Sequence, residues 1–275
     1  MSLKLFYLTT EISPFASTSH LGDYSVFIPL SLQTKGHDVR TMIPKYGFVS
    51  ERKYILREVI RLREIPFEFD GEEVITSAKS AFIPKTRVQV YFLENVDWYK
   101  SLTNLLYKAK NGRILSDNDA RYAYFSKAAI ATLSHLFCKP DDLICNGWQS
   151  SFVPLIYQHI YDSKDFYGKI KTVLTVHSVD EFCNFSRSAY DKVGVTLPKT
   201  IKGDTVNCYE AAAPFADLIV AVDSPSNDVT SKLLELPGIQ AHKKKIVSIS
   251  IDDDESPNFK ATADALNEEL MKHFA

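Results

Sequence analysis

A stretch of small polar residues near the N-terminus has the composition of an anion-binding or sugar-binding loop. The segment 10–29, TEISPFASTSHLGDYSVFIP, leaves an apolar run and enters a helical pattern. The residues before and at the start of that helix are Ser17, Thr18, Ser19, Gly22 and Asp23. Free backbone N–H groups at a helix N-terminus bind phosphates or sugar hydroxyl groups. The same residue types also cap helices, and residue type alone favours that structural role for Ser19 or Asp23.

Three further polar loops follow apolar runs, and two of them carry side chains that could contact a ligand. The loops are CNGWQSS (145–151), TVHSVDEFCNF (175–185) and VDSPSND (222–228). Trp148 could stack on a sugar ring beside Gln149, but a tryptophan at such a turn more often packs between strand and helix. His177 ends an apolar run, where a histidine is as often structural as catalytic. The residues alone indicate a polar cleft and leave its chemistry open.

The elements that must position these loops alternate between strands and helices. Strand patterns cover 4–10, 38–44, 88–94, 142–146, 171–177 and 217–223, and helical patterns lie before Gly36 and near 117–138, 149–161, 205–214 and 225–235. Short apolar strands separated by helices predict βαβ units around a sheet that is covered on both faces. Ligands bind such sheets at the carboxyl ends of the strands, where the polar loops begin. We therefore expect an α/β fold with a doubly wound, mainly parallel sheet.

Three segments depart from this alternation. Residues 51–86 contain an Asp-Gly pair between alternating segments, which predicts an inserted β-hairpin. Residues 100–117 have no clear period, so we expect a loop beside the site. After an acidic run at 249–259, a short helical pattern carries an apolar stripe made of Leu266, Leu270 and Phe274. A helix this short is marginal in water, so we expect it to dock on another surface, either its own domain or a second copy of the chain.

Composition and charge argue against several classes of partner. The 32 basic and 34 acidic residues give no charge excess that would favour nucleic acid or an anionic membrane. No apolar run is long enough to cross a bilayer, and the N-terminus resembles a strand more than a signal peptide. The acidic clusters have no metal-ligand spacing. The four cysteines show neither zinc-ligand spacing nor a C-x-x-C pair, so we expect buried thiols in a cytoplasmic protein.

Six blocks of the sequence follow, in order, the motifs of one enzyme family. FYLTTEISPFASTSHLGD is similar to S-E-x-x-P-F-x-K-T-G-G-L-G-D, and GHDVRTMIPKYG (36–47) is similar to G-H-x-V-x-x-x-x-P-x-Y. DNDARYAYFSKAA (117–129) and NGWQSSFVPL (146–155) resemble D-N-x-x-R-F-x-x-F-x-x-A-A and H-D-W-Q-T-x-x-x-P. LTVHS (174–178) and ADLIVAVDSPS (216–226) resemble T-I-H-N and A-D-x-x-x-T-V-S. Together the blocks resemble the N-terminal domain of bacterial glycogen synthases and plant starch synthases.

This resemblance implies a fold, a reaction and a set of site residues. The implied fold is a single Rossmann-like domain, the N-terminal half of a GT-B glycosyltransferase, over residues 1–250. A linker and helix follow at 251–275, with no second GT-B domain expected. The family reaction is retaining glucosyl transfer from ADP-glucose to the non-reducing end of an α-1,4-glucan, and it needs no cofactor. The implied catalytic residues are His177 and Asp23, and the implied donor-binding or sugar-binding residues are Ser17, Thr18, Gly22, Trp148 and Gln149.

The positions that would contact the donor depart from the family pattern. The lysine of the first loop is Ser17, and the paired glycines are Ser19 and His20. A lost lysine–phosphate contact is worth roughly 1–3 kcal/mol. A Cβ in place of a glycine can also block close approach of the backbone. Three further positions differ from the pattern: Asn146, Gly147 and Ser178. We therefore expect a degenerate donor site and a pseudoenzyme.

These departures leave alternative functions open. One is a short glucosyltransferase that a partner chain or a homodimer completes. Another is a non-catalytic descendant that binds α-glucan or a small sugar, or that regulates a full-length synthase. A third alternative is that the sequence is a fragment. Because a GT-B enzyme closes two domains over its donor, the substitutions and the expected lack of a second domain favour the non-catalytic descendant.

Overall fold

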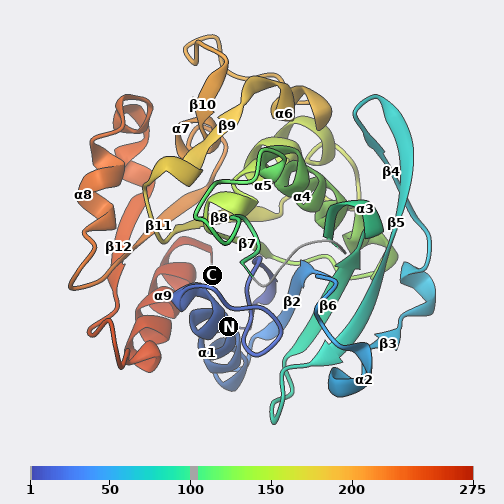
Figure 1. Ribbon diagram of the computed structural model, residues 1–275. Helices are drawn as coiled ribbons and strands as arrows, with labels where there is room; N and C mark the ends of the chain where they lie inside the picture. Colours follow the sequence, from blue (N-terminus) through green and yellow to red (C-terminus); the bar gives the residue numbers. More distant parts are fainter. Residues whose placement is uncertain (1, 100–104, 275) are drawn as a thin grey trace.

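A ten-stranded sheet forms the centre of the computed structural model, which describes residues 2–99 and 105–274 (Figure 1). Its parallel part has the strand order β12-β11-β8-β7-β1-β2-β6. These strands are β1 (Lys4–Leu8), β2 (Asp38–Pro44), β6 (Gln89–Glu94), β7 (Asp142–Asn146), β8 (Lys171–Val176), β11 (Leu218–Asp223) and β12 (Ile246–Ser250). The predicted α/β fold and mainly parallel sheet are confirmed, and β12 is a strand that the sequence reading missed.

Strand β1 shows why the sheet is apolar on both faces. Its Leu5 and Tyr7 join a hydrophobic cluster with α1 (His20–Thr34) and α9 (Phe259–Phe274). Its Phe6 and Leu8 join the larger cluster on the opposite face. That face is covered mainly by α4 (Asn118–His135), α5 (Phe152–Ile156) and α7 (Cys208–Ala212). Because successive strand residues point to opposite faces, a strand with a helix layer on each side must be continuously apolar.

The first helix ends where a local signal predicted. Gly36, with a φ of +95°, follows the last turn of α1 as a left-handed stop. The last helix before the C-terminus, α9, lies against α1 (Figure 1), with Leu266 and Leu270 fully buried between it and the sheet. The predicted docking of this helix is therefore confirmed. No helix in the described part of the chain is long and apolar enough to span a membrane.

The predicted hairpin extends the sheet at one edge. Its strands are β4 (Ile65–Phe69) and β5 (Glu72–Phe82), and β5 pairs antiparallel with both β6 and β3 (Arg57–Glu58). The turn residues Asp70 and Gly71 have φ values of 57° and 78°, as a two-residue hairpin turn requires. Phe67 and Phe69 pack edge-to-face on Tyr124 of α4. The hairpin thus forms a wall beside α4.

Three predicted segments differ in detail. A helix is expected at 205–214, but its first residues form β10 (Thr205–Asn207), which pairs with β9 (Asn184–Ser186). The Asn207 side chain then caps α7, which is therefore shorter than expected. The helix expected at 149–161 is divided into a 3₁₀ turn, α5 and a π-helical turn, η3 (Tyr157–Tyr161). The loop expected at 100–117 falls partly outside the described residues, and an antiparallel bridge joins Lys108 to Ile114 within it.

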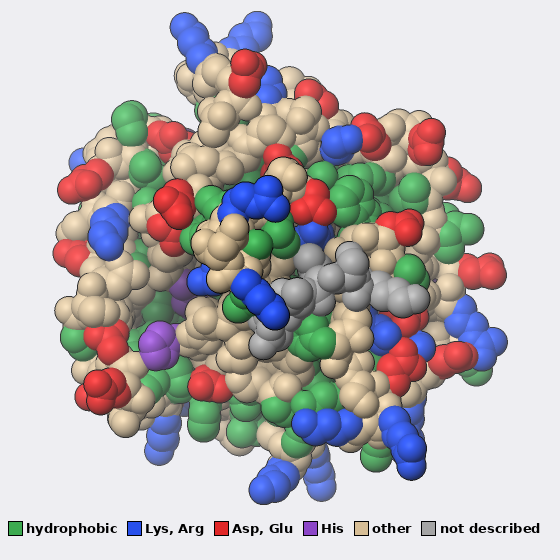
Figure 2. Space-filling view, viewed as in Figure 1, with side chains coloured by type: hydrophobic (Ala, Val, Ile, Leu, Met, Phe, Trp, Pro, Cys, Tyr) green, Lys and Arg blue, Asp and Glu red, His purple; other side chains and the backbone are tan. Residues whose placement is uncertain are grey.

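The remaining short elements connect these layers. They are α2 (Glu51–Tyr54), the 3₁₀ turns η1 (Ile60–Leu62), η2 (Trp148–Ser150), η4 (Glu181–Cys183) and η5 (Pro237–Lys245), and the helices α3 (Val96–Tyr99), α6 (Arg187–Lys192) and α8 (Val229–Leu234). All four cysteines are buried and unpaired, in agreement with the expected buried thiols. Basic and acidic side chains are interspersed over the face seen in Figure 2.

Candidate functional site

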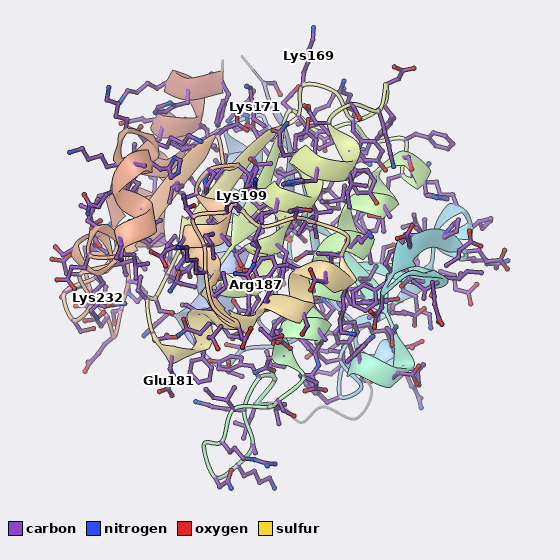
Figure 3. All side chains as sticks on the ribbon, turned by 90° about the horizontal axis from the view of Figure 1, so that it is seen from above. Lys169, Lys171, Glu181, Arg187, Lys199 and Lys232 are labelled. Carbon is purple, nitrogen blue, oxygen red and sulfur yellow. The ribbon has the colours of Figure 1, made fainter. Side chains whose placement is uncertain are left out.

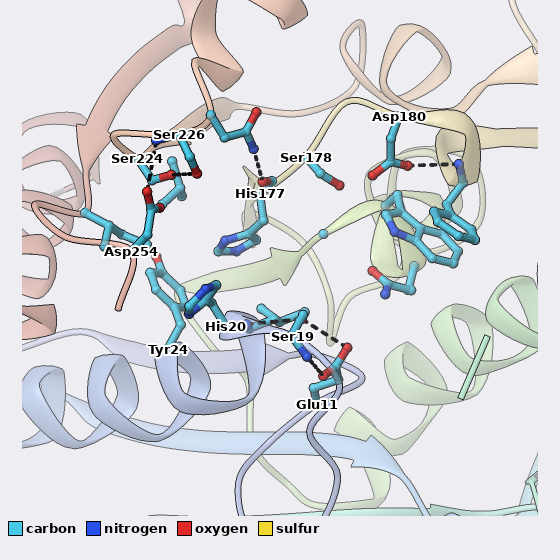
Figure 4. Close-up of a pocket in the computed structure, with 18 of the residues that line it drawn as sticks. Glu11, Ser19, His20, Tyr24, His177, Ser178, Asp180, Ser224, Ser226 and Asp254 are labelled. Atoms are coloured by element: carbon cyan, nitrogen blue, oxygen red, sulfur yellow. Dashed lines mark hydrogen bonds between the residues drawn. The ribbon is translucent and has the colours of Figure 1, made fainter. Parts of the chain in front are cut away.

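The four polar loops meet at one cavity of about 330 Å³ at the carboxyl ends of β1, β7, β8 and β11 (Figure 4). This volume lies at the lower end of the ~300–1,000 Å³ typical of small-molecule sites. Each loop contributes at least two lining residues, which in chain order are Glu11 and Ser19, Trp148 and Gln149, His177 and Ser178, and Ser224 and Ser226. A fifth segment, after β12, adds Asp253 and Asp254. The predicted position of the cleft is therefore correct.

The first loop is organised around its own glutamate. The Glu11 carboxylate is 1% exposed and accepts hydrogen bonds from the backbone N–H of Thr18 and from that of Ser19 at 3.1 Å. It also accepts from the hydroxyl groups of Thr18 at 2.9 Å and Ser19 at 3.3 Å. Burial raises the pKa of Glu11, and these hydrogen bonds oppose the rise. The backbone donors that could bind an external anion are thus already bound to a carboxylate of the chain.

Most of the predicted residues of this loop do not reach the cavity. Ser17 and Asp23 are exposed, Thr18 is half-buried, and none of them is among the lining residues. Gly22 is also outside the lining, and it is needed for packing because an added Cβ would lie 2.4 Å from the Ser17 hydroxyl oxygen. Ser19 accepts a hydrogen bond from the N–H of Leu21 and caps α1. The structure therefore favours the capping interpretation for Ser19, and it places Asp23 outside the cavity lining together with Ser17, Thr18 and Gly22.

His177 lies where the sequence placed it, at the end of β8. Its ring packs edge-to-face on Tyr24, with 4.7 Å between ring centroids, and its Nε2 is buried without a hydrogen-bond partner among the described residues. Its backbone carbonyl accepts a hydrogen bond from the Asn227 amide at 3.3 Å. Burial lowers the pKa of His177 to about 4, so the imidazole is neutral at pH 7. A neutral imidazole beside a cavity can donate or accept a hydrogen bond with a ligand hydroxyl group.

Trp148 belongs to an aromatic cluster at the cavity wall. It is 5% exposed and stacks on Phe182 with 5.8 Å between centroids, while Tyr107 and Tyr122 meet it edge-on. The packing role considered for this residue is therefore realised, and Tyr107 and Phe182 add aromatic surface to the cavity lining. A role of Trp148 in sugar stacking stays a prediction.

Gly147, which stands where the family pattern has an acidic residue, is constrained by its backbone and by Gln149. The Gln149 side chain is buried, and its Oε1 has no hydrogen-bond partner among the described residues. Gly147 has φ +73° and ψ 176°, a region that side-chain-bearing residues avoid. A Cβ at this glycine would lie 2.6 Å from Gln149 Oε1. The backbone and the glutamine together require a glycine here.

The cavity is electronegative. Its carboxylates, Glu11, Asp180, Asp253 and Asp254, approach from different sides (Figure 4), and none of the described lining residues is a lysine or an arginine. Hydrogen bonds from Ser224 and Ser226 lower the pKa of Asp254, which keeps this carboxylate ionised at neutral pH. No group of three or more His, Cys, Asp or Glu side chains in the described residues could hold a metal ion.

The sequence reading missed these carboxylates as site residues. Glu11 lies inside the first block, but its approach to Thr18 and Ser19 depends on how the loop folds back. The acidic run at 252–255 falls within the expected linker. Pairing of β12 with β11 brings its aspartates to the cavity. A strand pattern at 246–250 followed by acidic residues was the signal that could have identified them.

Comparisons with known proteins agree with these observations. A family model described as starch synthase catalytic domain matches residues 4–231. The glycogen synthase of Chlorobium limicola is 32% identical over 79% of this chain and 45% of its own length. That of Pelodictyon phaeoclathratiforme is 27% identical over 96% of this chain and 55% of its own. The chain therefore spans about half the length of these curated relatives.

A solved structure shows the same fold. The catalytic domain of starch synthase IV from Arabidopsis thaliana, bound to ADP and acarbose, superposes with a TM-score of 0.76. The sequence identity is 23%, and the match covers 92% of this chain and 52% of the plant chain. At this identity the similarity establishes the arrangement of elements, while the chemistry of the cavity must be argued from its own residues.

Proposed function

Because the chain belongs to the starch synthase catalytic domain family, we propose that it acts in α-glucan metabolism and binds a glucosyl unit in the cavity at the carboxyl ends of the strands. One observation carries this proposal: the cavity offers carboxylates, hydroxyl groups and a neutral imidazole, with no lysine or arginine among its described lining residues. Such groups match an uncharged polyol, since sugar hydroxyl groups can donate to carboxylates and accept from serines.

A nucleotide diphosphate matches this cavity poorly, and we propose that the donor site is degenerate in this half of the fold. The N–H groups of Thr18 and Ser19 are bound to Glu11, and Ser17 supplies no charge. Asp254 lies across the cavity from Glu11 (Figure 4), Asp253 is a further lining residue, and both carboxylates would repel phosphates. The bound ADP of the plant structure is thus not expected here, whereas its acarbose is a useful probe.

A second candidate is glucosyl transfer from ADP-glucose, and His177 favours it. Its buried, unpartnered Nε2 borders the cavity in a neutral state, so it could bind a hydroxyl group of the glucosyl unit that is transferred. Under this alternative, a homodimer or a full-length synthase supplies the contacts to the donor phosphates. The buried, unpaired cysteines support a reducing, cytoplasmic location for either function.

Calorimetric titration distinguishes the two candidates. The chain is titrated separately with maltotetraose, acarbose, ADP and ADP-glucose, and it is also incubated with labelled ADP-glucose and a glucan primer. We expect saturable binding of the two oligosaccharides, no binding of ADP, and no incorporation of label. ADP binding tighter than maltotetraose binding would overturn the proposed degeneracy. Incorporation of label by the isolated chain would establish the second candidate.

A further inference from the structure

A second hollow lies on the α4 side of the sheet. It is a groove of about 510 Å³ between β4, α4 and η3, and its lining residues include Phe67, Lys127, His135, Tyr161, Lys164 and Gly194. The tip of the hairpin is tied to the end of α6, because the N–H of Asp70 donates to the carbonyl of Lys192 at 2.8 Å. The two side chains also form an ion pair. None of the residues that line this groove lines the first cavity. We refer to it as the lysine groove.

A buried lysine faces this groove without a partner. Lys127 lies in the middle of α4 and is 4% exposed, yet its amine forms no hydrogen bond or ion pair within the described part of the chain. Lysine side chains are almost never buried to this degree unless they are paired. Burial lowers the pKa of Lys127. The negative charge of Glu68 raises this pKa, and the positive charge of Lys164 lowers it further. The amine therefore lies in a desolvated environment with no carboxylate in ion-pair contact among the described residues, although Glu68 acts on it from a greater distance.

A second cation lies on the opposite wall. The Lys164 ammonium is 4.5 Å from the centroid of the Tyr161 ring, and its side chain has no ion-pair partner in the described residues. Glu68 is the only carboxylate among the described lining residues; it is exposed, and it lies beyond 4 Å of both lysine amines. The rest of the lining is largely apolar or aromatic: Pro66, Phe67, Ala131, Ile160, Tyr161 and Tyr167. The groove thus combines two ammonium groups with an apolar wall.

We propose that the lysine groove binds a phosphate monoester, with the phosphate group between Lys127 and Lys164 and the organic body against Tyr161. A phosphate monoester carries a charge of about −1.5 to −2 at pH 7, which matches two ammonium groups. Lysine binds phosphate as a point charge, and binding would supply the partner that Lys127 lacks. The apolar wall should favour a monoester over inorganic phosphate, because only the monoester has an organic body that can pack against it. This site is separate from the proposed glucan cavity and does not depend on it.

Thermal shift and calorimetric titration with phenyl phosphate test this proposal, with inorganic phosphate and sodium chloride at equal ionic strength as comparisons. Phenyl phosphate should raise the melting temperature of the native chain, because a ligand that binds only the folded state stabilises it. Sodium chloride should not, because screening weakens charge interactions without filling the site. No shift with phenyl phosphate, or an equal shift with chloride, would overturn the proposal. Equal affinity for inorganic phosphate would overturn the assignment of a monoester.

Two variants and one control locate the binding. Lys127→Met keeps the apolar stem and removes the buried amine, so the ligand-free variant should melt at or above the native temperature and bind phenyl phosphate at least tenfold more weakly. Lys164→Met changes an exposed residue, cannot disrupt the core, and should weaken binding severalfold. Lys199→Met, at an exposed lysine outside the groove (Figure 3), should change neither quantity. Native affinity in both groove variants would overturn the proposal.

Discussion

The two hollows of this domain differ in both charge and origin. The cavity at the strand ends is built by loops and lined by four carboxylates, whereas the lysine groove is built by helix and hairpin surfaces and contains two lysines. Each also contains polar groups without a partner among the described residues, including the buried His177 Nε2 and Gln149 Oε1 in the cavity and the amine of the buried residue Lys127 in the groove. The contrast in charge is the basis for proposing an uncharged polyol as the ligand of the cavity and an anion as the ligand of the groove.

This difference shows that the position of a site in a fold does not fix its charge. The carboxyl ends of parallel strands are the usual location for phosphate groups, because helix N-termini meet there. Here Glu11 occupies the N–H groups of Thr18 and Ser19, and no lysine or arginine is among the described lining residues, which is why we propose that this cavity does not favour an anion. The side chains, and not the topology, determine the class of ligand.

The largest expected effect concerns the buried histidine of the cavity. The pKa of His177 is lowered from 6.5 to about 4 in the folded state, so the unfolded chain binds more protons between these pH values. Stability should therefore fall by about 3 kcal/mol as pH decreases from 6.5 to 4. Urea unfolding as a function of pH measures this. His177→Gln should remove that component of the profile, while His135→Gln in the lysine groove serves as the control.

Two glycines with nearly the same φ provide a matched comparison of crowding in the two hollows. Gly147 has φ +73° and Gly194 has φ +74°, but an added Cβ meets Gln149 Oε1 at 2.6 Å in the first case and the Lys127 amine at 3.7 Å in the second. Gly147→Ala should destabilise the fold by about 2–3 kcal/mol and Gly194→Ala by about 1 kcal/mol. Urea unfolding measures both free energies of unfolding. Equal losses of that free energy in the two variants would show that crowding at Gln149 contributes nothing.

A smaller effect is expected from the two glutamates that line the hollows. Glu11→Ala leaves the N–H groups of Thr18 and Ser19 without their acceptor and should cost about 1–2 kcal/mol. Glu68→Ala, at an exposed position, should change stability by less than about 0.5 kcal/mol. The difference is measured by urea unfolding at pH 7. A larger loss at Glu68 would contradict the central role assigned to Glu11.

The smallest expected effect comes from restoring the family's lysine. Ser17→Lys adds one cation at an exposed residue outside the cavity lining, while the carboxylates and the Glu11 hydrogen bonds remain. ADP binding, followed by calorimetry, should therefore stay undetectable, and transfer from ADP-glucose should not appear. A clear gain of ADP affinity from this single change would refute the degeneracy proposed for the cavity.

Much of the fold was predictable because its signals are local. The Asp70-Gly71 pair specifies the hairpin turn through two positive φ values, and Gly36 ends α1 through another. The continuous apolar runs of β1 and β11 indicate strands that are buried on both faces. Strand β12 and the β9–β10 pair were missed because such short strands depend on their partners more than on their own sequence. The position of His177 at the cavity followed from its place after an apolar strand.

The sequence by itself determined the order of strands and helices, the edge of the sheet where loops gather, and the family resemblance. Only the tertiary structure decided the charge of each hollow. Glu11, Asp180 and Asp253 are far apart along the chain, and the folded loops bring them around one cavity. Lys127 lies on a helix that the hairpin packs beside, so the residue is 4% exposed and lines the groove. The physical reason is that burial and electrostatic energy depend on all neighbours in space, whereas helix, strand and turn preferences depend mainly on neighbours along the chain.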